Sequence, residues 1–124
     1  MPPVPPWFRW LAYFMAALLA VCVALQHNDP DPVRWMAIYG AGALLSAALP
    51  STRAAVLPGV LVGLAALAWA AYLTYLVWGE IELSDLTGKM SEHGGAVEVG
   101  REAGGLAIEA VWLLAASAFR RRRR

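Results

Sequence analysis

The chain has 124 residues, of which 60% are hydrophobic and 15% are charged, and its mean hydropathy is +0.54. Soluble domains average about 45–50% apolar and about 25% charged residues, so this composition excludes an ordinary soluble domain and indicates a membrane protein. The length allows one domain, and the single cysteine, Cys22, excludes an internal disulfide and a paired-cysteine redox site.

Four apolar segments follow one another along the chain, at about 7–26, 33–49, 54–79 and 103–119. A helix needs about 20 residues, within a range of about 17–25, to cross the hydrocarbon core. Backbone groups in lipid must be hydrogen-bonded within the segment, so these segments should be helical. No small-x-small cleavage site follows the first one, and we expect it to be retained as a helix. The sequence therefore predicts an all-α fold: a single-domain, four-helix membrane bundle over residues 1–124.

Basic residues divide unevenly between the two ends of this predicted bundle. One end carries Arg9, Arg53 and a run of five arginines at 120–124, whereas the other carries Arg34, Lys89 and Arg101 among eight acids. Arginine and lysine in short loops favour the cytoplasm, so we predict that both termini are cytoplasmic and that a loop at about 80–100 faces outward. The expected location is a multi-pass position in a plasma or inner membrane.

The five terminal arginines directly follow an apolar helix. Such a run indicates anchoring at anionic lipid headgroups rather than nucleic-acid binding. We therefore expect the lipid bilayer as a partner and no nucleic acid. The further expected partner is either another membrane protein or additional copies of the chain.

Two patterns bear on how the helices pack. Lipid gives helices no hydrophobic reason to associate, so small residues and polar contacts must hold them together. Gly59 and Gly63 form a GxxxG pattern, which is either a close helix contact or a chance result of an Ala- and Gly-rich span. Four residues of the second segment share one helix face, which is either a packing seam or the wall of a cavity: Trp35, Tyr39, Gly42 and Ser46.

The first connection, "QHNDPDP" (26–32), is unusually polar for a short turn. Asp31 can cap the second helix, and Pro32 suits the first helical position. Asn28 favours a turn, and Pro30 restricts the residue before it, Asp29, to extended conformations. These local roles do not require Gln26, His27 or Asp29.

A second polar cluster, "EVGREAGG" (98–105), opens the last segment. Glu98 and Glu102 are four residues apart and share a helix face. Arg101 either pairs with Glu98 on an exposed surface or reaches Asp29 or Asp31, because topology places both clusters on the same side of the membrane.

Glu109 continues that face into the membrane, about 10 Å inside the predicted outer boundary at 1.5 Å per residue. An ionisable group at this depth costs about 2.5–3.5 kcal/mol on insertion scales and usually faces the bundle interior or a water-filled cavity. Tyr39 and either Tyr72 or Tyr75 lie at similar depth and could hydrogen-bond to it. The carboxyl is either a site residue or a tolerated packing group.

Several oxygen and nitrogen side chains on the outer side suit a hard or borderline cation, although their spacing matches no known metal motif. They are His27, Asp29, Asp31, His93, Glu98 and Glu102. No catalytic, P-loop or dinucleotide motif is visible, so enzymatic activity and cofactors remain open.

Together the two polar clusters resemble the signatures of the transmembrane protein 220 family, Q-x-NDPD-x-x-x-W-x-x-x-Y after the first span and E-x-x-RE-x-x-GL at the last. The matching residues are Gln26, Asn28, Asp29, Pro30, Asp31, Trp35, Tyr39, Glu98, Arg101, Glu102, Gly105 and Leu106. The resemblance implies a small polytopic membrane protein and no established activity. Glu109 and both histidines stand outside these signatures.

Three functions remain open from the sequence. The outer polar cluster can be a structural lock or a small-ligand site in a non-enzymatic membrane protein. It can instead be a membrane enzyme or metal site that uses Asp29, Asp31, Glu98 and Glu102. The third hypothesis is a small transporter with Glu109 as its coupling carboxyl.

Overall fold

Each apolar segment forms a helix in the structure, a computed structural model that describes residues 4–25, 32–77 and 95–122. For 76–77 and 95–101 it describes the backbone only. The elements are α1 (Pro6–Leu25), α2 (Pro32–Ala48), a short 3-10 helix η2 (Arg53–Ala55), α3 (Val56–Val77) and α5 (Gly95–Arg122). No strand occurs within these described ranges, and the predicted all-α fold is confirmed.

The helix boundaries have local causes. Helix α2 begins at Pro32, where the fixed φ of proline suits the first helical position and its missing N–H costs nothing. The side chain of Thr52 caps η2 by accepting a hydrogen bond from the Ala54 backbone N–H at 3.1 Å. Helix α5 begins at Gly95, inside the stretch expected as loop at about 80–100. Backbone hydrogen bonds can continue past the membrane surface, so an apolar segment does not set the end of its helix.

Three helices are long and apolar enough to cross a membrane, over Pro6–Leu25, Arg53–Tyr75 and Glu102–Arg122. Helix α2 has 17 residues, which is about 26 Å at 1.5 Å per residue and near the lower limit for a span. Many large apolar side chains, such as Phe14 and Leu61, are exposed on the outside of the bundle. Lipid would cover such a surface.

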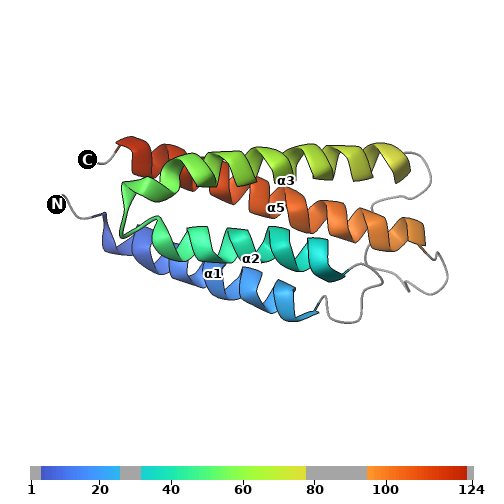
Figure 1. Ribbon diagram of the computed structural model, residues 1–124, viewed down its shortest axis with the longest axis horizontal. Coiled ribbons are helices and arrows are strands. Elements are labelled where there is room, and N and C mark those ends of the chain that lie inside the picture. The colour runs from blue at the N-terminus through green and yellow to red at the C-terminus, as the bar shows by residue number, and fades with distance from the viewer. Residues whose placement is uncertain (1–3, 26–31, 78–94, 123–124) are drawn as a thin grey trace.

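The helices form two antiparallel hairpins that lie against each other (Figure 1). Helix α1 packs mainly on α2, and α3 packs mainly on α5. Both ends of the chain lie at one end of the bundle, together with the connection between α2 and α3. The end of α1 and the start of α5 lie at the opposite end, which we call the outer end.

Close packing between α3 and α5 depends on Gly59 and Gly63, which are both buried. A Cβ atom at Gly63 would lie 2.9 Å from Cγ of Leu114, closer than real Cβ contacts allow. Gly59 is covered in the same way by the Ser117 hydroxyl. The GxxxG pattern therefore marks a genuine helix contact, in which the missing side chains let the two backbones approach.

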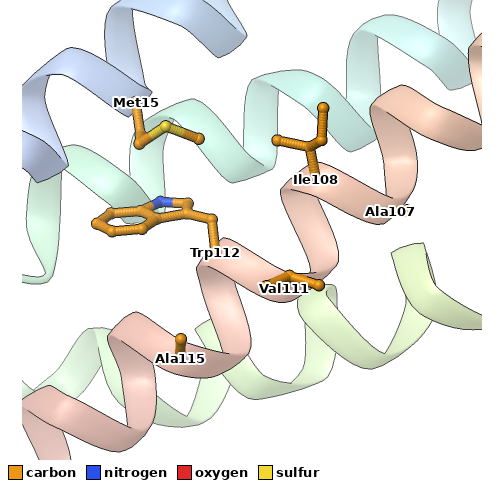
Figure 2. Close-up of a pocket in the computed structure, with 6 residues that line it drawn as sticks. All are labelled: Met15, Ala107, Ile108, Val111, Trp112 and Ala115. Atoms are coloured by element: carbon orange, nitrogen blue, oxygen red, sulfur yellow. The ribbon is translucent and has the colours of Figure 1, made fainter.

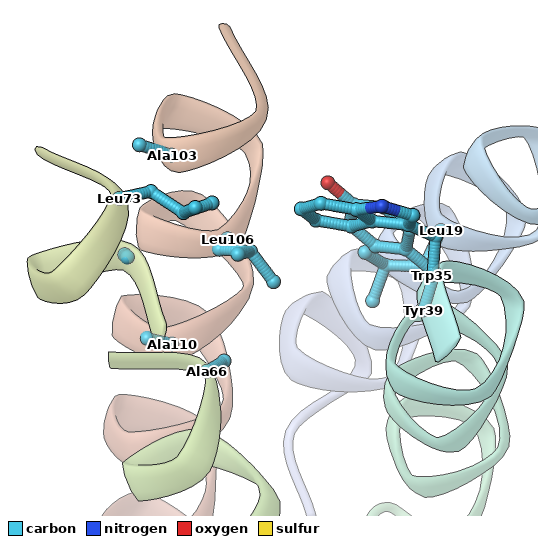
Figure 3. Close-up of a cluster of buried hydrophobic side chains, with 9 residues drawn as sticks. Leu19, Trp35, Tyr39, Ala66, Leu73, Ala103, Leu106 and Ala110 are labelled. Atoms are coloured by element: carbon cyan, nitrogen blue, oxygen red, sulfur yellow. The ribbon is translucent and has the colours of Figure 1, made fainter. Parts of the chain in front are cut away.

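Two apolar clusters fill the bundle. The outer one joins all four helices, as Figure 3 shows for Leu19 of α1, Trp35 and Tyr39 of α2, Leu73 of α3 and Leu106 of α5. The other lies at the end with the termini and includes Val4, Phe8, Leu49, Ala55 and Ala116. There the rings of Phe8 and Phe119 are 4.8 Å apart and tie α1 to α5.

Candidate functional site

The interface between α2 and α5 carries a line of buried polar groups, which we call the polar seam. On α2 the buried residues are Trp35, Tyr39, Gly42 and Ser46, the four that share a face in the sequence. Because this stripe is buried in the core, it is a packing seam. On α5 the seam includes Glu109, Trp112 and Arg120.

Aromatic stacking organises the outer end of the seam. The Trp35 ring stacks on Trp69 of α3 at 4.4 Å, and the Arg34 guanidinium lies 5.6 Å from the centre of the Trp69 ring. The Tyr39 hydroxyl lies over Gly105 of α5, where an added Cβ atom would be only 2.6 Å from Oη. Gly105 thus makes room for Tyr39, and α2 is joined to both α3 and α5.

Glu109 lies in the middle of the seam with 0% of its surface exposed. Neither carboxyl oxygen has a hydrogen-bond partner among the described residues. The carboxyl packs over Gly42, where an added Cβ atom would be 2.8 Å from Cδ of Glu109 and 3.1 Å from Cδ1 of Leu19. Cys22 and Tyr39 lie within electrostatic range of it. The glycine therefore creates the space that the carboxyl fills.

The tyrosines predicted to approach Glu109 do not bond to it. Tyr39 is buried nearby but makes no hydrogen bond with the carboxyl. Tyr72 and Tyr75 are 60% and 79% exposed. Both lie off the α3 face that packs on the bundle, which includes Ala66, Ala70 and Leu73, so the expectation for these two tyrosines was wrong.

A side-chain hydrogen bond continues the seam one turn beyond Glu109. Nε1 of Trp112 donates to Oγ of Ser46 at 2.8 Å, and the Ser46 hydroxyl donates to the Gly42 carbonyl at 2.7 Å. Trp112 also borders an apolar groove of about 500 Å³ between α1 and α5, beside Met15 (Figure 2). Glu109 does not line that groove, so its carboxyl is closed off from it.

Arg120 ends the seam at the end with the termini. It is only 2% exposed, and its Nε donates to the Leu49 carbonyl at 2.8 Å, just beyond the last residue of α2. This arginine therefore caps α2 and does not face headgroups as predicted for the whole arginine run. Continuing the Glu102–Glu109 stripe at helical spacing to Trp112 and Arg120 would have identified both residues.

A family model described as "Transmembrane family 220, helix" matches residues 18–118 of the chain. The chain belongs to transmembrane family 220. No curated protein and no solved structure gives a significant match. Arg120 and the rest of the arginine run lie outside the family match, whereas the seam from Trp35 to Trp112 lies within it.

The residues carrying the two family-220 signatures are placed only in part. Trp35, Tyr39 and Leu106 meet in the outer cluster, and Gly105 contacts Tyr39. Glu102 is half-buried at the start of the seam. The remaining predicted site residues lie outside the described side chains: Gln26, Asn28, Asp29, Asp31, Glu98 and Arg101.

Metal binding stays a prediction for this family-220 chain. Within 4–25, 32–77 and 95–122, no three histidine, cysteine, aspartate or glutamate side chains come together to hold a cation. His27 and His93 lie outside these ranges, as do Asp29 and Asp31. What the described seam offers chemically is one buried carboxyl able to bind a proton or a hydrogen-bond donor.

Proposed function

We propose that this family-220 protein is a non-enzymatic, multi-pass membrane protein whose outer polar cluster locks the first connection onto the start of α5. The observation that carries the proposal is the contact between the Tyr39 hydroxyl and Gly105. It brings one residue of the first signature against one residue of the second, which supports a lock between the polar residues that precede them. A small polar ligand could bind at the same cluster.

Within this lock, Arg101 pairs with Asp29. Both residues are predicted at the outer end by topology, and Asp31 is predicted to cap α2. An ion pair at the membrane surface contributes about 0.2–1 kcal/mol, which is enough to order a loop without dominating the stability of the bundle.

A charge swap tests the pairing. Asp29→Arg and Arg101→Asp should each lower the free energy of unfolding, measured by SDS titration, and the double variant should recover about 0.2–1 kcal/mol. The matched control combines Asp31→Arg with Arg101→Asp and should show no recovery. Strictly additive losses in the first double variant would refute the lock.

We further propose that all four helices cross the bilayer with both termini in the cytoplasm. Arg9, Arg53 and the terminal arginines at one end support this orientation. Single cysteines at Ser51 and Ser91 in a Cys22→Ser background provide a test with an impermeant maleimide. Ser91→Cys should react in intact cells, and Ser51→Cys should react only after permeabilisation.

Glu109 supports a second candidate function, transport or binding of a proton or a small cation. A buried carboxyl inside a span that has no hydrogen-bond partner among the described residues is costly, and such groups commonly mark ion or substrate pathways. Four helices leave no room for a wide pore, so a transporter would need further copies of the chain.

Proton flux into liposomes tests this candidate. Flux should be lost in Glu109→Gln, which keeps the shape of the side chain but cannot exchange a proton, and should persist in the control Glu102→Gln. Equal flux in the wild type and Glu109→Gln would exclude a coupling role for this carboxyl.

A further inference from the structure

The end of the bundle with the termini carries positive charge without nearby acidic residues. The segments that meet there, residues 4–12, 45–60 and 110–122, contain no aspartate or glutamate. They do contain Arg9, Arg53 and three arginines at 120–122. The hydrogen bond of Arg53 goes to the backbone carbonyl of Arg121, which carries no net charge. An anionic partner is therefore expected at this end.

A groove at this end combines two of these arginines with an apolar wall. It measures about 640 Å³ and lies between the start of α3 and the end of α5. Its lining comprises Arg53, Ala54, Val56, Leu57, Val60 and Arg121. Nη2 of Arg53 donates to the Arg121 carbonyl at 3.4 Å, which draws the two arginines to the same mouth of the groove.

The apolar part of the groove continues along the surface of α3. Leu57, Leu61 and Leu64 follow one another at helical spacing, and all are at least half exposed. They belong to a helix that is long and apolar enough to span a membrane, and in the proposed four-span arrangement this row faces hydrocarbon. The groove thus has a cationic end at the membrane surface and an apolar path leading into the bilayer.

We propose that this groove is a binding site for one anionic phospholipid. The phosphate lies between the Arg53 and Arg121 guanidinium groups, whose N–H donors match phosphate oxygens, and an acyl chain follows Val60 and the leucine row. A free inorganic anion would make no use of the apolar wall. A nucleic acid could not enter a groove whose lower half is embedded in the bilayer.

Native mass spectrometry in detergent measures such a site directly, because the micelle lacks the diffuse charge of an anionic membrane. The purified full chain is mixed with phosphatidylglycerol and phosphatidylcholine of the same acyl chains. One phosphatidylglycerol should remain bound in preference to phosphatidylcholine. Each arginine should contribute about fivefold, so Arg53→Gln and Arg121→Gln should each weaken binding by about that factor.

Two further variants separate a built site from general attraction. Arg122→Gln removes the same charge from the adjacent residue, which does not line the groove, and should change binding less than twofold. Val60→Trp keeps every arginine but fills the acyl path, and it should abolish the preference. Circular dichroism confirms that each variant stays helical.

Three results would overturn the proposal. Equal losses in Arg121→Gln and Arg122→Gln would mean that only total charge matters. Normal phosphatidylglycerol binding by Val60→Trp would mean that no acyl chain enters the groove. Complete displacement of the lipid by inorganic phosphate would identify a site for the free anion instead.

Discussion

Glu109 and Arg120 are both buried charged residues on the inner face of α5, eleven positions apart, and they differ in what surrounds them. Arg120 lies at the end of the bundle and donates from Nε to the Leu49 carbonyl. Glu109 lies mid-span against Gly42 and Leu19, with no hydrogen-bond partner among the described residues. Arg120 satisfies a backbone carbonyl at the end of α2. The described packing gives the Glu109 carboxyl no comparable structural role.

The difference teaches how to separate structural from functional polar residues in a membrane bundle. A helix end leaves unsatisfied carbonyls, and Arg120 satisfies one of them, so packing alone explains its burial. The packing does not require a carboxyl at position 109. Instead, Gly42 has no side chain, and this leaves the space that the Glu109 carboxyl fills. Natural proteins tolerate such a group when function depends on it.

Among the substitutions that test this contrast, replacing Arg120 should change the free energy of unfolding most. Arg120→Met keeps the length but leaves the Leu49 carbonyl without its charged donor, and should lower the free energy of unfolding by about 1.5–3 kcal/mol. SDS titration measures this loss. Arg53 lies within electrostatic range, so part of the loss is offset by reduced repulsion.

Arg122→Met is the matched control, because it removes the same charge from an exposed position of the same run. It should leave the unfolding free energy nearly unchanged. If both variants behaved alike, Arg120 would have no capping role.

Gly42→Ala tests whether the space for Glu109 is as tight as the structure indicates. The added methyl meets both the carboxyl and Leu19, and the overpacking should cost about 1–3 kcal/mol. Gly40→Ala is the control, since its new Cβ atom meets only Val23 at 3.9 Å. Adding Glu109→Ala should rescue Gly42→Ala, and failure to rescue would place the clash elsewhere.

Much of this arrangement follows from sequence patterns, and the reason differs for each part. Hydropathy identified the helices because lipid demands long apolar segments. The Trp35–Ser46 stripe and the Gly59–Gly63 pair follow from helical spacing. The depth of Glu109 also follows from its position in the span, since depth depends only on the rise per residue.

What the sequence could not predict depends on neighbours across the bundle. Helical spacing places Arg120 on the inner face of α5, but nothing in the run of five arginines shows that its partner is the Leu49 carbonyl. Helical spacing likewise places Trp112 on that face, but it does not reveal the partly buried hydrogen bond to Ser46. The absence of a hydrogen-bond partner for Glu109 among the described residues depends on α1 and α2, which place Leu19 and Gly42 against it, as much as on α5.

Glu109→Met should stabilise the protein, in contrast to Arg120→Met. It replaces a buried carboxyl that has no hydrogen-bond partner among the described residues with an apolar chain of similar length, a gain of about 1–2 kcal/mol in unfolding free energy. Glu102→Met, at a half-buried position near the surface, should give no such gain. A loss of stability in Glu109→Met would show that the carboxyl has a structural partner and would remove the contrast with Arg120.

The hydrogen bond between Trp112 and Ser46 lies between Glu109 and Arg120 along the polar seam. Its loss should change the free energy of unfolding least. Interhelical hydrogen bonds in membranes contribute about 0.6 kcal/mol on average, because alternative partners are available in the less folded state. A double-mutant cycle isolates this bond: Trp112→Phe and Ser46→Ala should couple by about that amount in SDS titration. Pairing Trp112→Phe with Ser117→Ala is the control, since Ser117 faces Gly59 and should show no coupling.

A coupling that matched the loss in Arg120→Met would mean that α2 is held to α5 along its length. A small coupling would leave Arg120 and the Tyr39–Gly105 contact as the main polar ties between α2 and α5.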